Sequence, residues 1–329
     1  MCVLCVKDLN IGFFSGKKKV VPTVSDVSFQ LKRGEILALV GESGCGKSIS
    51  CMSLSKLLPS PPAVVSGSVK LTKKDGSEIE VFGLSAKELR KIRGKEIAYI
   101  FQEPSVSLNP VFRIDTQIKE VLSLHRPDVE DQDREVISLL KKVGIPAPET
   151  RAKAYPHELS GGMQQRVMIA MALASNPSVL VADEPTTALD VTIQAQILDL
   201  LKQLRKDQGM SIILVTHNLG IVSEMADRVC VMYAGRIVET APVRELMERP
   251  RHPYTKALLK AVPVLGGEKG KLSTIPGTVP MPSDFPPGCR FCDRCSKVPE
   301  GTELCRETVP PLREITPDHL CACHFPEKY

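Results

Sequence analysis

Short apolar runs alternate with helical patterns over about the first 250 residues. The runs 36–40, 179–182 and 211–215 are almost entirely aliphatic and β-branched, which is typical of strands buried on both faces. Apolar residues recur at helical spacing over 191–204 and around 136–143. This alternation predicts an α/β fold with a mostly parallel core sheet.

Three other segments differ from that pattern. Residues 20–32 and 66–82 alternate in polarity and include the turn signal Asp75-Gly76, which predicts an antiparallel β flank beside the main sheet. Residues from about 114 to 174 lack strong strand candidates and predict a helical insert. We therefore expect a first domain over 1–250, with this helical subdomain inside it, and a C-terminal extension over 251–329. Within the extension, residues 275–287 hold five prolines, which predict a stiff, extended connector.

Composition narrows the class of protein. The chain has 329 residues, of which 43% are hydrophobic and 25% charged, values that argue against disorder. A net charge of +5 is too small to indicate a nucleic-acid partner. No apolar run approaches the roughly 18 residues of a membrane-spanning helix, and the first residues lack the pattern of a secretory signal. We therefore expect a cytosolic protein.

A phosphate-binding loop follows the first predicted buried strand. Gly41-Glu42-Ser43-Gly44-Cys45-Gly46-Lys47-Ser48 fits the P-loop pattern G-x-x-x-x-G-K-[ST] and precedes a helical segment that begins near Ile49. Its glycines let successive backbone N–H groups point at phosphates, and the helix start adds a favourable dipole. Lys47 is placed to reach the β and γ phosphates, and the Ser48 hydroxyl to ligate Mg²⁺. Cys45 is expected to be a neutral filler of the loop.

A second predicted strand supplies acidic groups. The run 179–182 ends in Asp183 and Glu184, the arrangement of a Walker-B element. We expect Asp183 to hold Mg²⁺ and Glu184 to polarise the attacking water. Both carboxylates would then lie at the C-terminal edge of the sheet, where ligands of α/β sheets gather.

One further motif points to a family. Leu159-Ser160-Gly161-Gly162-Met163-Gln164-Gln165-Arg166 resembles the LSGGQ signature of ATP-binding-cassette (ABC) ATPases. Ser160, Gly161 and Gly162 would expose backbone N–H groups at the start of a helix over about 163–174. The resemblance implies that this element contacts the γ phosphate of ATP bound to a second ATPase subunit, identical or related. Two subunits would then sandwich two nucleotides head to tail.

The other elements of the family occur in order. Gln102 matches the Q-loop glutamine, which senses Mg²⁺ and the nucleophilic water; Ala188-Leu189-Asp190 matches the D-loop; and His217 matches the switch histidine at the γ phosphate. Phe13, with Phe14 next to it, is the candidate for stacking on adenine. The resemblance thus implies catalytic roles for Glu184, His217 and Gln102. The nucleotide would be bound by Phe13, Gly41, Ser43, Gly44, Cys45, Gly46, Lys47, Ser48, Ile49, Ser160, Gly161, Gly162, Gln164 and Asp190, and Mg²⁺ by Ser48, Gln102 and Asp183.

The C-terminal part resembles one particular group within this family. His252-Pro253-Tyr254-Thr255-Lys256-Ala257-Leu258-Leu259 and the segment from Ile275 to Cys289 resemble the extension of oligopeptide and dipeptide importer ATPases. This implies an ATPase on the cytoplasmic face of the membrane, bound to two transmembrane permease subunits. An extracellular solute-binding protein would be an indirect partner. Two rivals stay open: an importer subunit for another solute, such as nickel or a glycan, and a cassette ATPase of DNA maintenance. The single cassette and the absence of a coiled-coil segment argue against the second.

Six of the eleven cysteines crowd into residues 289–323, a segment with too few large apolar groups for a core of its own. Disulfides need an oxidising compartment, so a metal is favoured, either Zn²⁺ or an iron–sulfur cluster. Spacing alone would select Cys289, Cys292 and Cys295. The family resemblance implies instead a [4Fe-4S] cluster on Cys289, Cys295, Cys305 and Cys323. Cys292 and Cys321 would then be accessory thiols or replacement ligands, and a redox-sensing tail is a further possibility.

Overall fold

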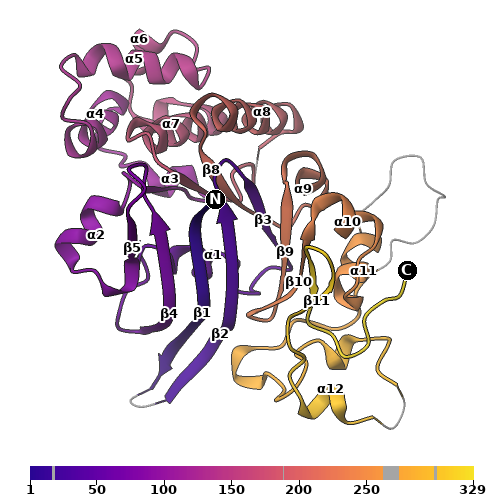
Figure 1. The fold of residues 1–329 in the computed structure, drawn as a ribbon. Helices are drawn as coiled ribbons and strands as arrows, with labels where there is room; N and C mark the ends of the chain where they lie inside the picture. The colour runs from indigo at the N-terminus through magenta and orange to yellow at the C-terminus, as the bar shows by residue number, and fades with distance from the viewer. Residues whose placement is uncertain (17–18, 188, 262–273, 300–301) are drawn as a thin grey trace.

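Two sheets and the helices around them make up the computed structural model, which describes residues 1–16, 19–187, 189–261, 274–299 and 302–329. The larger sheet has eight strands in the order β11-β12-β10-β9-β3-β8-β7-β6, and the smaller has four in the order β2-β1-β4-β5. Figure 1 shows the smaller sheet in front of the larger one, helices α4–α7 at the top and the C-terminal tail at the lower right. The α/β fold with an antiparallel flank is confirmed.

The strands have the following bounds: β1 Cys2–Ser15, β2 Lys19–Lys32, β3 Ile36–Val40, β4 Ala63–Thr72, β5 Glu78–Glu80, β6 Ile97–Ile100, β7 Val179–Asp183, β8 Ser211–Thr216, β9 Arg228–Tyr233, β10 Arg236–Pro242, β11 Arg313–Thr316 and β12 His319–Cys321. Strands β9, β3, β8, β7 and β6 pair in parallel. The predicted strands at 36–40, 179–182 and 211–215 are the centre of this parallel core.

Two apolar cores explain why these strands are apolar at every position. In β3, Ile36, Ala38 and Val40 face the helices, whereas Leu37 and Leu39 face the antiparallel sheet. Successive side chains of a strand point to opposite faces, so a strand with both faces covered needs apolar residues throughout. The sheet therefore holds the ends of β3 and β7 rigidly, and the phosphate-binding and acidic motifs follow at those ends.

The helices are α1 Lys47–Ser53, α2 Ala86–Ile92, α3 Pro104–Ser107, α4 Ile114–His125, α5 Gln132–Lys142, α6 Pro148–Arg151, α7 Gly161–Ala174, α8 Val191–Gln208, α9 Leu219–Met225, α10 Val243–Glu248, α11 Pro253–Lys260 and α12 Leu304–Glu307. Helices α4, α5, α6 and α7 fall where the helical insert was predicted. None of the helices in the described ranges has the length and apolarity that a membrane span requires.

The C-terminal tail continues the large sheet. Strand β12 pairs antiparallel with β10, so that Glu239 lies opposite Cys321, and β11 pairs with β12. The buried Glu239 carboxylate accepts hydrogen bonds from the backbone N–H groups of Arg251 (2.5 Å) and His252 (2.9 Å), and lies 2.6 Å from Nε2 of His319. One side chain thus joins β10, the start of α11 and β12. In the described part of the proline-rich connector, residues 282–284 form one 3₁₀ turn.

Candidate functional site

The P-loop curls tightly between β3 and α1. Gly41, Gly44 and Gly46 have φ angles of 155°, 77° and 101°, which L side chains rarely adopt. A Cβ atom at Gly41 would lie 2.1 Å from the carbonyl oxygen of Met232 on β9. The neighbouring strand therefore excludes any side chain at Gly41, and the loop keeps the curl that phosphate binding needs.

Lys47 is fixed over this loop. Its side-chain ammonium donates to the carbonyl oxygens of Gly41 (2.9 Å) and Glu42 (3.0 Å), and the residue is only 6% exposed. The loop borders an open hollow, lined by Gly41, Glu42, Ser43, Gly44, Gly46, Lys47, Ser48, Ile49, Gln102, Glu184, Thr187, His217 and Leu258. Most of the residues that were assigned to nucleotide and catalysis from sequence therefore meet around one cavity.

Asp183 lies buried beside the first turn of α1. Burial raises the pKa of its carboxyl and the neighbouring charge of Glu184 adds to this, whereas a hydrogen bond from Ser48 lowers it. Its Oδ1 atom is buried without a hydrogen-bond partner among the described residues. A carboxylate oxygen and a hydroxyl are suitable donors for Mg²⁺, and an unsatisfied buried oxygen is stabilised by a cation. The donor set therefore fits the predicted metal.

Glu184 is held by three side chains. Its carboxylate accepts hydrogen bonds from Gln102 Nε2 (3.1 Å) and Thr187 Oγ1 (2.8 Å), and His217 Nδ1 lies 2.9 Å from the other oxygen. Burial works to raise the pKa of Glu184, but the hydrogen bonds from His217 and Thr187 outweigh it, so the pKa lies below the ordinary value. The side chain is therefore ionised at neutral pH and fixed toward the cavity. Thr187 was not identified from the sequence.

The signature motif lies in a second hollow. Ser160 caps α7 by accepting the N–H of Met163 at 3.3 Å, and Asp190 caps α8 by accepting the N–H of Ile193 at 2.9 Å. This hollow is lined by Gly144, Pro146, Ser160, Gly161, Gly162, Met163, Arg166, Leu189, Asp190, Ile193 and Gln196. The amide of Gln164 donates to the carbonyl oxygens of Pro156 and Leu159. One chain thus carries two separate half-sites.

Several predicted residues lie apart from both hollows. Phe13 is half-buried on the antiparallel sheet, opposite Val21 on β2 and Ala63 on β4, while Phe14 is 46% exposed. Cys45 is buried within the loop, with its sulfur 3.8 Å from Lys47 Nζ. Ala188 lies outside the described residues. Stacking of Phe13 on adenine stays a prediction.

The extension reaches the P-loop directly. Tyr254 on α11 accepts the backbone N–H of Glu42 at 2.9 Å through its hydroxyl. Arg294, between two tail cysteines, donates to both carboxylate oxygens of Glu42 at 2.7 and 3.0 Å. Hydrogen bonding to Glu42 raises the pKa of this guanidinium further above its ordinary value. These contacts, and the position of Leu258 in the lining of the P-loop cavity, were not predicted from sequence. Residues so far apart in the chain form no local pattern that would indicate a contact.

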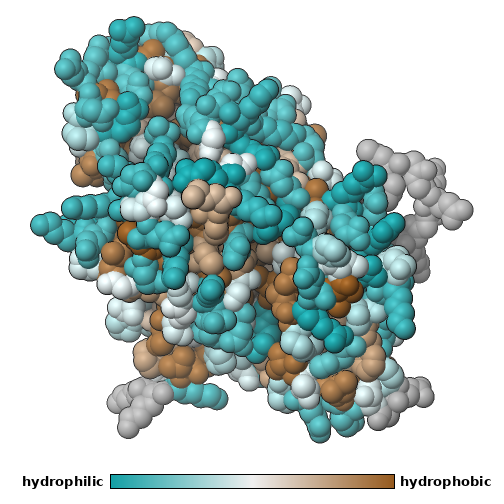
Figure 2. All heavy atoms as spheres, viewed as in Figure 1, coloured by the Kyte–Doolittle hydropathy of each residue, from teal (hydrophilic) through white to brown (hydrophobic). Residues whose placement is uncertain are grey.

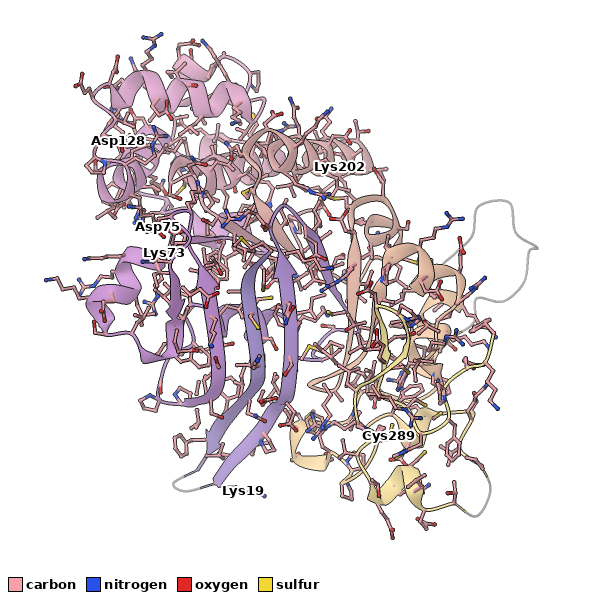
Figure 3. The ribbon with its side chains drawn as sticks, viewed as in Figure 1. Lys19, Lys73, Asp75, Asp128, Lys202 and Cys289 are labelled. Atoms are coloured by element: carbon pink, nitrogen blue, oxygen red, sulfur yellow. The ribbon has the colours of Figure 1, made fainter. Side chains whose placement is uncertain are left out.

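The tail cysteines gather around a small hollow. Five of them (Cys289, Cys292, Cys295, Cys305 and Cys323) line it together with His252, Phe291 and His324, whereas Cys321 lies on β12 beside Glu239. Burial is the main reason that the pKa of Cys289 is raised to about 12 and that of Cys323 to about 11. Figure 3 labels Cys289 within this part of the tail. In the described ranges, no disulfide occurs, and no three His, Cys, Asp or Glu side chains converge closely enough to hold a metal ion.

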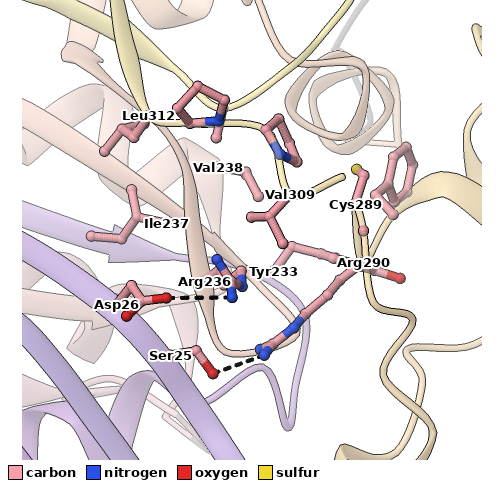
Figure 4. A pocket seen from close by; sticks show the side chains of 15 residues that line it. Ser25, Asp26, Tyr233, Arg236, Ile237, Val238, Cys289, Arg290, Val309 and Leu312 are labelled. Carbon is pink, nitrogen blue, oxygen red and sulfur yellow. Dashed lines mark hydrogen bonds and ion pairs between the residues drawn. The ribbon is translucent and has the colours of Figure 1, made fainter. Parts of the chain in front are cut away.

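A further hollow lies where the tail packs on the cassette (Figure 4). Arg290 crosses from the tail and donates to Ser25 Oγ at 2.8 Å and to the Ala234 carbonyl oxygen. Arg236 pairs with Asp26 at 3.4 Å in the same hollow. Two arginines and one aspartate line this hollow, and it lies outside the P-loop cavity. Figure 2 shows a mostly hydrophilic face, on which apolar atoms form small separate groups.

The layered sheets, the P-loop beside an acidic strand end and the separate signature half-site define an ABC-type ATPase. Residues 24–187 match the family described as ABC transporter, and residues 238–301 match the oligopeptide/dipeptide transporter, C-terminal region. The chain belongs to the ABC transporter ATP-binding proteins that carry this C-terminal region. Hydrolysis of ATP coupled to transport is the activity of this class.

Curated relatives match over nearly their whole length. The chain is 49% identical to the oligopeptide transport ATP-binding protein AppD of Bacillus subtilis (strain 168), over 94% of this chain and 92% of that one. It is 42% identical to the dipeptide transport ATP-binding protein DppD of Escherichia coli (strain K12), over 99% and 97%. The dimeric, post-hydrolysis structure of the cassette MJ0796 bound to ADP and Pi has a TM-score of 0.63 and 28% identity, covering 73% of this chain and 99% of that one.

Proposed function

We propose that this chain is the ATP-hydrolysing subunit of a membrane importer for oligopeptides or dipeptides, acting at the cytoplasmic face. The separation of the P-loop cavity from the signature hollow carries the proposal, since neither half-site alone surrounds a nucleotide. A second copy or a related chain, arranged head to tail, would bring each P-loop against a signature helix. The dimeric state of the similar cassette MJ0796 supports this arrangement. The match over 238–301 and the peptide-transport names of the relatives support the cargo class.

In this proposal the P-loop binds ATP through its backbone N–H groups and Lys47. When bound, Mg²⁺ supplies charge neutralisation at the phosphates, and Ser48, Asp183 and Gln102 are the residues that would hold it. Because Lys47 contacts two carbonyl oxygens of its own loop, it is oriented before the nucleotide arrives.

The same proposal places the chemistry at Glu184. Its ionised carboxylate accepts a hydrogen bond from the attacking water and orients that water toward the γ phosphate. Gln102, Thr187 and His217 fix the carboxylate. The side chain of His217 is exposed, so it would also be able to contact the γ phosphate. The partner's Ser160, Gly161, Gly162 and Gln164 segment, with Asp190, would close the site from the other side.

The Q-loop neighbourhood offers a surface for the two permease subunits. Val106, Val111 and Phe112 follow Gln102 in the chain and are 77%, 70% and 50% exposed. Large apolar side chains exposed this close to a catalytic residue favour a protein partner. A permease segment docked there would be coupled to Gln102, and through it to the Glu184 carboxylate.

The decisive experiment isolates this chain with its native membrane partners in lipid and measures ATP hydrolysis with the solute-binding protein and candidate solutes. Stimulation by oligopeptides or dipeptides is the expected result. Stimulation by nickel or a glycan alone would reassign the cargo, and hydrolysis that depends on DNA would overturn the transport role. Lys47→Ala is the control that removes ATP binding.

We also propose that Cys289, Cys295, Cys305 and Cys323 hold a [4Fe-4S] cluster, with Zn²⁺ as the alternative. All four thiols line one hollow, and a donor set made only of cysteine fits either metal. The four thiols do not lie close enough together to hold a metal. Binding would therefore require their side chains to turn toward one another and to lose their protons.

Anaerobic purification should then yield brown protein with iron and acid-labile sulfide. Cys323→Ser should lose iron, whereas Cys321→Ser, beside Glu239 and off the hollow, should keep it. Stoichiometric zinc without sulfide would identify the alternative.

A further inference from the structure

Glu42 in the P-loop is held through both its backbone and its side chain. Its backbone N–H donates to the Tyr254 hydroxyl at 2.9 Å, and its carbonyl oxygen accepts from Lys47 at 3.0 Å. Both carboxylate oxygens accept from Arg294. Two of these partners belong to the C-terminal extension, so the first turn of the phosphate-binding loop is fixed from outside the cassette's own motifs.

Arg294 is itself rigidly placed. Its side chain is only 6% exposed, and Nε donates to the carbonyl oxygen of Pro276 in the proline-rich connector at 2.8 Å. Nη1 also donates to the Tyr233 hydroxyl at 3.2 Å, and the guanidinium lies 6.0 Å from the ring centre of Phe291. A planar guanidinium held in this way presents its fork to a carboxylate with little further loss of entropy.

The aromatic rings around it join the extension to the sheet. The Tyr233 and Tyr254 ring centres are 4.6 Å apart, and Phe291 lies 5.2 Å from Tyr233 and 5.3 Å from Tyr254. Tyr254 and Phe291 come from the extension and Tyr233 from β9. This cluster leaves Arg294 and the Tyr254 hydroxyl little room to move relative to the P-loop.

The position of Lys47 depends on the same segment. Its ammonium is held by the carbonyl oxygens of Gly41 and Glu42, so a shift of Glu42 would move both the ammonium and the adjacent N–H groups. Such a shift would move these donors away from the phosphates and weaken their contacts with bound ATP. A link therefore runs from the tail cysteines, through Arg294 and Glu42, to the lysine of the P-loop.

We propose that Arg294 is a positioning residue for ATP binding, which fixes Glu42 and thereby presets Lys47 and the P-loop backbone for the phosphates. The inference rests on the proposed use of this loop in binding ATP. It makes the extension part of the nucleotide site and predicts that the extension influences affinity for ATP more than turnover at saturation. Binding that is equal in the ground state and the transition state changes KM and leaves kcat almost unchanged.

The test compares Arg294→Gln, Arg294→Lys, Glu42→Gln and the double variant Glu42→Gln/Arg294→Gln in the full chain. Equilibrium binding of ATP and steady-state hydrolysis are measured, with thermal unfolding as the check on folding. The matched control is Arg290→Gln: Arg290 is partly buried and joins the same tail segment to the cassette, but it binds Ser25 and Ala234 rather than the P-loop.

Arg294→Gln is expected to weaken ATP binding by about tenfold, the effect of losing a charge-assisted buried hydrogen bond. The kcat should change by less than about twofold. Arg294→Lys should restore part of the affinity, and the double variant should be no weaker than the worse single variant, because both changes break one interaction. Arg290→Gln should bind ATP like the wild type even if its unfolding temperature falls.

Three results would overturn the inference: wild-type affinity in Arg294→Gln, additive losses in the double variant, or an equal loss of affinity in Arg290→Gln. If Arg294→Gln does not fold, Arg294→Lys and Glu42→Gln carry the same comparison. Failure of the proposed function is recognised separately, since the wild type would then not bind ATP or Lys47→Ala would bind it equally well.

Discussion

The nucleotide half-site and the cysteine-rich tail are built in opposite ways. The P-loop is eight consecutive residues whose geometry follows from three glycines and the buried strand before them. The tail has little regular structure, and its contacts reach far along the chain, from Cys321 to Glu239 and from Arg294 to Glu42. The curl of the loop follows mainly from its own residues, whereas the conformation of the tail follows from what it packs against.

This difference changes what the tail is expected to do. A module that only carried a metal would need no contact with the phosphate-binding loop. Here β12 continues the central sheet, and Arg294 binds a P-loop carboxylate. The tail is therefore connected to the P-loop through the packed rings of Tyr233, Tyr254 and Phe291, of which Tyr254 contacts Glu42.

The largest expected effect belongs to the locally determined region. Glu184→Gln removes the charge that orients the water but keeps a side chain of the same size. Turnover should fall by about a thousandfold, while ATP binding is retained and the nucleotide-bound dimer accumulates. Phosphate release and size-exclusion chromatography with ATP measure the two outcomes. Glu248→Gln, at an exposed pair on α10, is the control, and near-normal hydrolysis by Glu184→Gln would contradict the assigned role.

The same contrast explains what the sequence could predict. Strands β3, β7 and β8 were predicted because burial on both faces demands unbroken apolar runs, and the P-loop and acidic motifs follow directly after two of them. Their side chains meet around one cavity because parallel strands end at the same edge. Thr187 lies only three positions after Glu184, but a threonine after a turn does not indicate by itself that it binds a carboxylate.

The contacts of the extension could not be predicted in this way. The ion pair between Arg294 and Glu42 joins residues 252 positions apart, and its geometry depends on the connector and three aromatic rings. The pairing of β12 with β10 also joins distant residues, and a three-residue strand has no periodicity to detect. The family resemblance grouped Cys292 and Cys321 as accessory thiols, whereas the structure places Cys292 in the lining of the thiol hollow and Cys321 on β12 beside Glu239.

The second prediction concerns how firmly the extension is attached to the sheet. Glu239→Ala leaves the N–H groups of Arg251 and His252 and the ring of His319 without their buried acceptor. We expect the free energy of unfolding to fall by about 3 kcal/mol, the cost of breaking a buried polar network. Denaturant unfolding measures the change, and Glu248→Ala should cost almost nothing because its partner Arg244 is exposed. Equal stability of the two variants would mean that the tail is attached independently of this network.

The smallest expected effect refines the electrostatics of the catalytic carboxylate. The Glu184 pKa lies below the ordinary value because hydrogen bonds from His217 and Thr187 outweigh burial. In the proposed mechanism the ionised form is the active one, so hydrolysis should be constant above this pKa and fall as the pH drops through it. Thr187→Val removes one hydrogen bond to the charged form, and the acid limb should therefore move to higher pH.

The rate of ATP hydrolysis against pH, at saturating ATP, measures that shift. Arg290→Gln changes the tail without touching Glu184 and should leave the acid limb in place. If Thr187→Val lowered the rate equally at every pH, Thr187 would position the carboxylate without stabilising its charge. If Arg290→Gln moved the limb as well, the tail would influence the carboxylate that is proposed to orient the water. The division between a locally determined site and its packed support would then not hold for the chemistry.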